Sequence, residues 1–178
     1  MVKIALAFLS VAFLGGAHPS RPTTCEICSC RTSEAPRNAL DSSDAVFRAR
    51  VVALDDRPIP YPDVTSLKRE ARQEAEWEYL RRSVERLRVT LEVRRVWKGD
   101  VGERIDIYTA NECCICGYPF ELGKEYLIYA YRLPSGRLVT NICSRTRPMA
   151  QAWEDLAALG AGVQPSRFPI DFGERPLD

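Results

Sequence analysis

The chain has 178 residues, with 25 basic and 24 acidic side chains and one histidine. This length fits a single domain, and the near-neutral charge gives no reason to expect a nucleic acid or an anionic membrane surface as a partner. The one histidine, His18, excludes a histidine-rich zinc site. It is also the only imidazole base that a Ser-His-Asp or Cys-His nucleophile could use.

The first residues are typical of a secretion signal. An apolar run from Ile4 to Leu14 follows Lys3 and ends in Gly15-Gly16-Ala17, which gives the basic start, short apolar middle and small-residue exit of a signal peptide. The run is too short to span a bilayer, and no later run reaches the ~18 apolar residues of a membrane span. A buried core helix is the alternative, but the flanking residues favour export. We therefore predict cleavage after Ala17 and a secreted protein, extracellular or periplasmic.

Seven cysteines form two clusters and one isolated position. They are Cys25, Cys28 and Cys30, then Cys113, Cys114 and Cys116, then Cys143. Export favours disulfides, although an odd number leaves at least one cysteine outside any pair in the chain. The two Cys-x-x-Cys pairs also have the inner spacing of a four-thiolate zinc site, but they lie much further apart than the usual ~15–20 residues. Disulfides are therefore favoured over zinc, and a redox centre ranks below both because no strand-helix-strand pattern surrounds the thiols.

Alternation of apolar and polar residues predicts five strands. They run from Ala45 to Leu54, Arg88 to Trp97, Arg104 to Thr109, Glu125 to Leu133 and Arg137 to Ile142. In the first strand, Phe47, Val51 and Ala53 fall on the apolar face. In the second, the consecutive apolar residues Val96 and Trp97 indicate a bulge that shifts the alternation.

A charged, helix-forming stretch from Asp63 to about Leu87 separates the first two strands and contains no glycine or proline. Its apolar stripe changes side along the helix, from Val64 and Leu67 to Trp77 and Leu80. This predicts either a break near Glu76 or a helix that contacts the domain with its second half only. A solvated insertion is favoured over a partner-binding helix.

A last helix is expected after Thr146-Arg147-Pro148, ending at Gly160. Its expected buried residues are Met149, Ala152, Trp153 and Leu156. Residues 161–178 carry three prolines without periodicity, so we expect an extended tail.

These elements together predict a mainly β fold, a five-stranded OB-like antiparallel barrel with a helical insertion between its first two strands and a C-terminal helix. A β-sandwich is disfavoured because seven or more strands do not fit the sequence.

Several short motifs follow one another in a distinctive order. They are Cys28-Ser29-Cys30, Asp44-Ala45-Val46-Phe47, Val96-Trp97-Lys98-Gly99, Cys116-Gly117, Tyr126-Leu127-Ile128-Tyr129-Ala130 and Cys143-Ser144-Arg145-Thr146-Arg147-Pro148. Together they resemble a bacterial member of the tissue inhibitor of metalloproteinases (TIMP) family, whose domain is the netrin-like variant of the OB barrel. We therefore expect a signal peptide over 1–17, a leader over 18–27, a TIMP-like domain over 28–160 with the insertion at 63–87, and the tail.

The resemblance also implies a disulfide pattern. The pairs carried over from the family are Cys28–Cys116 and Cys30–Cys143. In the chain-entropy model, closing loops this long would restrict the unfolded chain by roughly 4–5 kcal/mol each. We expect Cys25 to form a disulfide with Cys113, with Cys114 as the alternative partner. One cysteine would then have no disulfide partner within the chain.

In the resembled family, the first cysteine of the Cys-x-Cys pair is the mature N-terminus, and its α-amine and carbonyl oxygen bind the zinc of the protease. The resemblance thus implies that Cys28, Ser29 and Cys30 form a ridge that contacts a zinc metalloprotease. Residues 18–27 depart from this pattern, because after cleavage at Ala17 they would precede Cys28 and place its nitrogen in a peptide bond.

The expected function is therefore a secreted binding module that inhibits a metalloendopeptidase. It would not be an enzyme and would have no cofactor, metal ion or transmembrane segment of its own. Its partner would be a zinc metalloprotease or another extracellular protein. The alternative is a non-inhibitory interaction module at the cell envelope or outside the cell.

Overall fold

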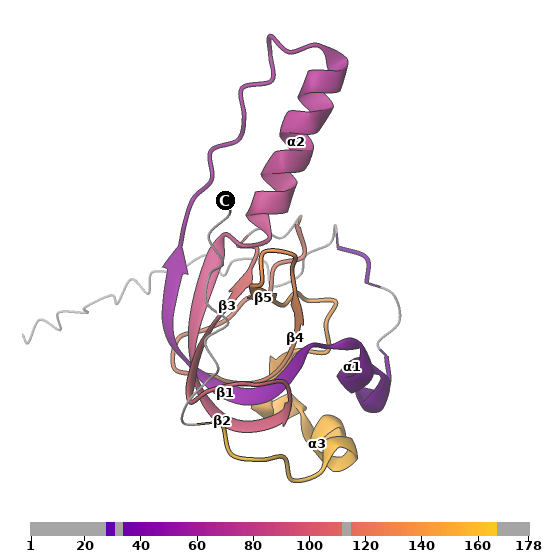
Figure 1. Ribbon diagram of the computed structural model, residues 1–178, viewed down its shortest axis with the longest axis vertical. Coiled ribbons are helices and arrows are strands. Elements are labelled where there is room, and N and C mark those ends of the chain that lie inside the picture. Colours follow the sequence, from indigo (N-terminus) through magenta and orange to yellow (C-terminus); the bar gives the residue numbers. More distant parts are fainter. Residues whose placement is uncertain (1–27, 31–33, 112–114, 167–178) are drawn as a thin grey trace, which may run out of the picture.

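Five strands wrap into a closed barrel in the computed structural model, which describes residues 28–30, 34–111 and 115–166 (Figure 1). The strands are β1 (Ala45–Asp56), β2 (Leu87–Lys98), β3 (Arg104–Thr109), β4 (Glu125–Arg132) and β5 (Leu138–Val139). Around the barrel the order is β1-β2-β3-β5-β4, and β4 pairs with β1 to close it. The predicted mainly β, OB-like barrel is confirmed. One pairing, β3 with β5, is parallel, and the rest are antiparallel.

Some of the predicted features lie outside the described residues. These are the signal peptide, the leader with His18, the cysteines Cys25, Cys113 and Cys114, and residues 167–178 of the tail. Within the described part of the tail, Val163 exchanges two backbone hydrogen bonds with Val96, at 2.8 and 2.7 Å. The first residues after the last helix therefore lie along β2.

The barrel interior is filled by the alternating apolar residues of its strands. The buried set includes Phe47, Ala49, Val51, Val89, Leu91, Ile107, Tyr126 and Ile128. The predicted bulge in β2 is present: Arg95 lies opposite Arg48 and Val93 opposite Ala49, so Arg94 has no partner in the β1–β2 ladder and Val96 returns to the interior. A further register shift in this ladder, at Val52, turns Ala53 outward, so its predicted place on the apolar face is wrong.

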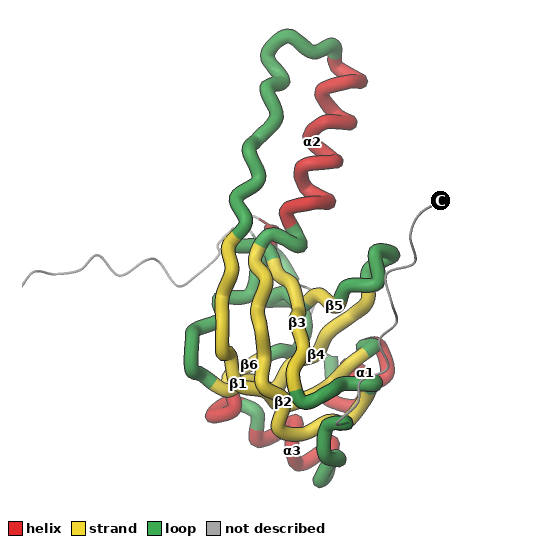
Figure 2. Tube along the Cα trace, turned by 60° about the vertical axis from the view of Figure 1, so that its left-hand side comes forward, coloured by secondary structure: helices red, strands yellow, loops and turns green. Residues whose placement is uncertain are grey.

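Two short helices cover the outside of β1 and β4. Helix α1 (Pro36–Ser42), which the sequence pattern did not indicate, lies beside α3 (Trp153–Leu159). Both pack on a second apolar cluster that includes Val46, Leu127 and Tyr129. Figure 2 shows the two helices beside each other at the end of the barrel away from the insertion.

The start of the last helix differs from the prediction. After β6 (Arg147–Pro148), residues Met149–Gln151 form a 3-10 turn, and α3 begins only at Trp153. The 3-10 turn changes the angular position of the residues that follow. Trp153, which we expected to be buried, is therefore 76% exposed, and Asp155 is buried instead. Ala152 is buried as expected.

The Val96-Trp97-Lys98-Gly99 motif connects both apolar clusters. Val96 belongs to the barrel interior and Trp97 to the outer cluster, where its indole nitrogen donates to the carbonyl of Gly160 at 2.9 Å. Lys98 donates from Nζ to the carbonyl oxygens of Leu40 and Asp41 at the end of α1. A cation at this position satisfies helix C-terminal carbonyls and complements the helix dipole.

The insertion between β1 and β2 forms an arm, residues 57–86, that stands away from the barrel in both views (Figures 1 and 2). Its helix, α2 (Arg69–Ser83), is continuous, so the predicted break near Glu76 is wrong. Ser83, the last residue of α2, is its only buried residue, whereas Trp77 and Leu80 are exposed, so the alternative expectation that the second half of the helix contacts the domain holds only at its last residue. The arm contributes no residue to the two apolar clusters.

Removing the arm should therefore leave the barrel folded. Asp56 lies opposite Leu87 in the β1–β2 ladder, so replacing residues 57–86 with Asn-Gly closes the strands with a two-residue turn. Each halving of loop length lowers the closure cost by about 0.6 kcal/mol, which offsets the loss of exposed ion pairs at the base of the arm. We expect the free energy of unfolding in urea to change by no more than about 1 kcal/mol. A loss above about 3 kcal/mol would mean that the arm supports the core.

Candidate functional site

The segment Cys28-Ser29-Cys30 is held against the barrel by two disulfides. Cys28 is bonded to Cys116 and Cys30 to Cys143, with Cα separations of 5.5 and 5.1 Å. These are the pairs that the family resemblance implies. Ser29 between them is exposed. Two bridges on alternate residues fix both the position and the direction of this segment, which we call the ridge.

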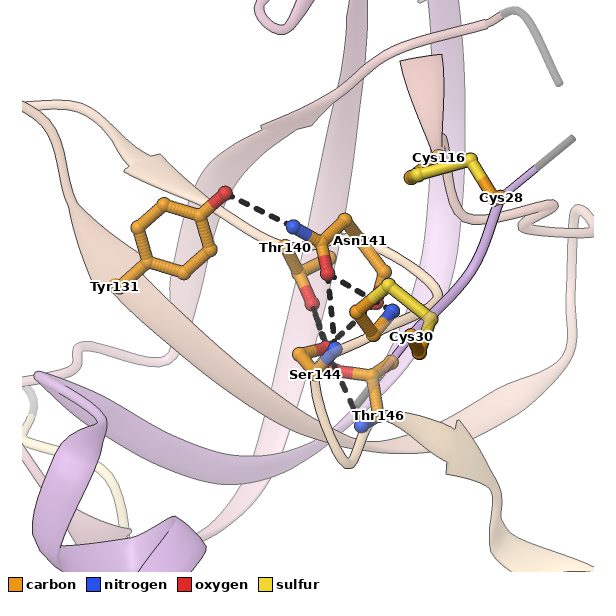
Figure 3. The surroundings of a disulfide bond; sticks show 9 residues. Cys28, Cys30, Cys116, Tyr131, Thr140, Asn141, Ser144 and Thr146 are labelled. Atoms are coloured by element: carbon orange, nitrogen blue, oxygen red, sulfur yellow. Dashed lines mark hydrogen bonds between the residues drawn. A yellow bond between two sulfur atoms is a disulfide. The ribbon is translucent and has the colours of Figure 1, made fainter. Parts of the chain in front are cut away.

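The two partner cysteines lie on neighbouring loops, and Figure 3 shows Cys116 close to Asn141 and Ser144 of the other loop. The backbone nitrogen of Ile142 donates to the carbonyl oxygen of Cys116 at 3.0 Å, which joins the loops directly. The side-chain oxygen of Asn141 accepts from the backbone nitrogens of Cys143 and Ser144, both at 2.9 Å. This Asx turn presents Cys143 to the ridge at a defined place.

Hydroxyl groups connect the Cys143 loop to strand β4. The hydroxyl oxygens of Thr140 and Thr146 lie 2.9 and 3.2 Å from the carbonyl oxygen of Tyr129 and 2.8 Å from each other, so they share hydrogen bonds with this carbonyl and with one another. Ser144 lies 2.7 Å from the Thr140 hydroxyl (Figure 3). Because Thr140 and Thr146 are buried, their mutual hydrogen bonds rigidify the loop in a low-dielectric region.

The Cys116 loop depends on a glycine. Cys116 adopts a φ of 58°, a left-handed conformation that ordinary residues avoid. A Cβ on the following Gly117 would lie 1.9 Å from the carbonyl oxygen of Ala110. The Cys-Gly pair therefore allows the chain to pass close to the end of β3 and to present Cys116 to Cys28.

The comparisons with known proteins agree with this geometry. The family model described as tissue inhibitor of metalloproteinase matches residues 26–160, which include the ridge, both partner cysteines and α3. This protein belongs to the TIMP family. Metalloproteinase inhibitor 2 of Gallus gallus is 24% identical over 154 residues, covering 85% of this chain. The chain spans 58% of the length of that relative. The bacterial affiliation stays a prediction.

A buried ion pair holds the C-terminal helix of this TIMP domain in place. Asp155 on α3 accepts from the Arg145 guanidinium at 2.5 Å and from the Tyr129 hydroxyl at 2.7 Å, and it lies 3.4 Å from Arg147. The Asp155 side chain is fully buried, and that of Arg145 is 6% exposed. Arg145 also donates to the backbone carbonyl of Glu34. One guanidinium thus connects α3, the Cys143 loop and the segment that follows the ridge.

Arg145 belongs to the motif Cys143-Ser144-Arg145-Thr146-Arg147-Pro148 that was identified from the sequence. Its partner, Asp155, was not identified from the sequence. Asp155 lies three residues after Ala152 and four before Leu159, so it falls on the same face of the helix as these apolar residues. A single carboxylate on an apolar helix face indicates a buried partner, and this signal could have found the pair.

A cleft of about 860 Å³ runs beside the ridge of the TIMP domain. Its lining includes Cys30, Tyr118, Tyr131, Asn141 and Arg145. Burial raises the pKa of Tyr118 and Tyr131 above the ordinary tyrosine value. Both hydroxyls are therefore neutral at physiological pH, and that of Tyr131 accepts a hydrogen bond from the Asn141 side chain at 3.1 Å.

The described part of the TIMP domain contains no cluster of three histidine, cysteine or acidic side chains that could hold a metal ion. Within it, no helix has the length and apolar character that crossing a membrane requires. The site offers an exposed, fixed ridge and a cleft lined by both polar and aromatic side chains. This arrangement suits recognition of another molecule.

Gly117→Ala should destabilise the TIMP domain severely, because the added methyl group overlaps backbone atoms that cannot move independently. We expect the free energy of unfolding to fall by at least about 3 kcal/mol, measured by urea denaturation. Gly123→Ala is the matched control: its φ is +77°, but nothing lies within 4 Å of its Cβ. The control should lose only about 1 kcal/mol, and equal losses in the two variants would contradict the steric account.

Asp155→Asn should cost about 3 kcal/mol in urea denaturation, because it leaves the buried Arg145 charge without its one buried carboxylate partner. Glu154 also contacts Arg145 but its side chain is 52% exposed. Glu154→Gln should therefore cost less than about 1 kcal/mol. A loss below about 1 kcal/mol for Asp155→Asn would show that the buried pair does not hold α3.

Proposed function

We propose that this protein is a secreted TIMP-like module that binds a zinc metalloendopeptidase through its ridge, Cys28-Ser29-Cys30, and inhibits it once the chain begins at Cys28. The observation that carries the proposal is the pair of disulfides from alternate ridge residues to two adjoining loops. These disulfides hold the exposed Ser29 and the backbone on either side of it in one fixed orientation. A protease cleft that accepts an extended substrate chain would accept such a segment without further ordering.

The chemistry of inhibition would come from the end of the ridge. In the TIMP family, the free α-amine and the carbonyl oxygen of the first Cys-x-Cys cysteine occupy the zinc position where the protease would activate water. Cys28 is the matching residue here. An amide nitrogen has its lone pair delocalised into the peptide bond and is no such ligand, so we propose that residues preceding Cys28 are removed before inhibition.

Secretion belongs to the same proposal. The signal-like N-terminus and the disulfides of the ridge support an oxidising, extracellular or periplasmic location. Family membership supports a role as an inhibitor and not an enzyme. The relative from Gallus gallus carries the name metalloproteinase inhibitor, which is why a zinc metalloendopeptidase is the partner we propose.

The alternative is a non-inhibitory interaction module. The arm supports it, because residues 57–86 stand away from the barrel (Figure 1) and most of them are exposed. In that case the partner would be bound by the arm or the barrel face. Binding would then be the same whether the Cys28 nitrogen is a free amine or part of a peptide bond.

Three forms of the protein test the proposal: one that begins at His18, one that begins at Cys28, and one with a single alanine before Cys28. Each is titrated against purified zinc metalloendopeptidases that cleave a fluorogenic peptide. We expect the Cys28 form to inhibit at least about 100-fold more tightly than the other two, because only its amine can bind zinc.

The alanine-extended form is the matched control, since it keeps both disulfides and differs by one residue. Equal inhibition by all three forms would contradict amine ligation. If the Cys28 form carries both disulfides and inhibits none of the proteases, the inhibitor assignment is wrong and the interaction module is favoured.

A further inference from the structure

One face of α2 is covered within the chain. The extended limb of the arm, residues 57–68, packs against it: the Tyr61 and Tyr79 rings meet edge to face at 5.0 Å between centroids. The Tyr61 hydroxyl donates to Glu76 at 3.3 Å, and Arg72 donates to the carbonyl oxygen of Val64 at 3.1 Å. This face of the helix therefore has its partner already.

A second face of α2 is open and carries apolar side chains. Trp77 is 53% exposed and Leu80 is 39% exposed. With Gln73 before them and the half-buried Val84, which directly follows α2, after them, they lie at spacings of four, three and four residues. This is the spacing of the a and d positions along the contact line of a two-helix coiled coil. We call these four residues the open face of α2.

Charges beside the open face favour a second copy of the same helix in the opposite direction. Glu74 and Arg81 occupy equivalent flanking positions, seven residues apart, on the same side of the open face. They contact each other along the helix at 2.8 Å. In an antiparallel pair centred between Trp77 and Leu80, Glu74 of one copy lies across from Arg81 of the other, twice by symmetry.

The shape of the molecule excludes the parallel arrangement. Packed helices lie only about 8–10 Å apart, and each arm rises directly from its own barrel (Figures 1 and 2). Parallel arms at this distance would force the two barrels into the same space. Antiparallel arms place the barrels on opposite sides of the contact, with Arg69 at the start of each α2 beside Arg88 at the start of β2 in the other copy.

We propose that the open face of α2, made of Gln73, Trp77, Leu80 and Val84, binds a second copy of this chain as an antiparallel helix pair. Trp77 of each copy packs on Leu80 of the other, and Glu74 pairs with Arg81 across the contact. The ridge lies on the barrel, outside this contact, so the dimer presents two ridges. The face is small, and the dissociation constant is expected on the order of 0.1 mM.

Sedimentation velocity and equilibrium on the His18–Asp178 chain, from about 1 µM to 1 mM, measure the association. Glu74→Arg and Arg81→Glu should each weaken self-association at least about tenfold, because like charges then face each other. An equimolar mixture of the two variants should associate as tightly as the unchanged chain. In the mixed pair the introduced arginine of one variant meets the introduced glutamate of the other, and the retained Arg81 meets the retained Glu74. The contact between positions 74 and 81 within one helix is lost in both variants, so it cannot explain the recovery.

Trp77→Glu should abolish association, whereas Trp153→Glu, at the exposed tryptophan of α3, is the matched control and should leave it unchanged. Circular dichroism and disulfide mapping check that each variant is folded. The proposal is overturned if the unchanged chain is monomeric at 1 mM, if Trp77→Glu still associates, or if mixing the charge variants restores nothing.

Discussion

The attachment of residues 28–30 to the barrel by two disulfides is the constraint on which the rest of the site depends. Cys28 and Cys30 are tied to Cys116 and Cys143, residues far away in the sequence whose loops are joined by a backbone hydrogen bond. Such bridges chiefly restrict the unfolded chain, and more so for long loops. They also leave the ridge little freedom to lose when a partner binds, which reduces the entropic cost of recognition.

The supports behind the ridge explain motifs whose role the sequence alone does not reveal. Gly117 permits a close approach to Ala110, and Asn141 orders the turn that carries Cys143. Arg145, buried against Asp155, fixes the C-terminal helix and contacts the chain just after the ridge. A buried ion pair of this kind adds little net stability, but removing one partner is costly because it leaves the other charge buried without compensation. The order of short motifs along the sequence thus corresponds to one connected set of contacts around the ridge.

Much of the barrel could be predicted because its strands are half-buried and alternate with a period of two. The β2 bulge was visible in the consecutive apolar residues Val96 and Trp97. Other features depend on contacts that no local pattern encodes. The bulge at Val52 turned Ala53 outward, and a 3-10 turn rotated Trp153 into solvent. Helix α1 has only seven residues, too few for a periodic signal, and it is stabilised by packing against α3.

For the site, the sequence indicated the ridge and its cysteines through family resemblance, but physical reasoning on spacing alone left zinc and disulfides both open. The central claim is that oxidation fixes the ridge in one place. Peptide mapping by mass spectrometry of the non-reduced, secreted protein tests it most directly. The account predicts the links Cys28–Cys116 and Cys30–Cys143, together with a defined N-terminal residue. Reduced thiols at these four positions, or a different pairing among them, would contradict it.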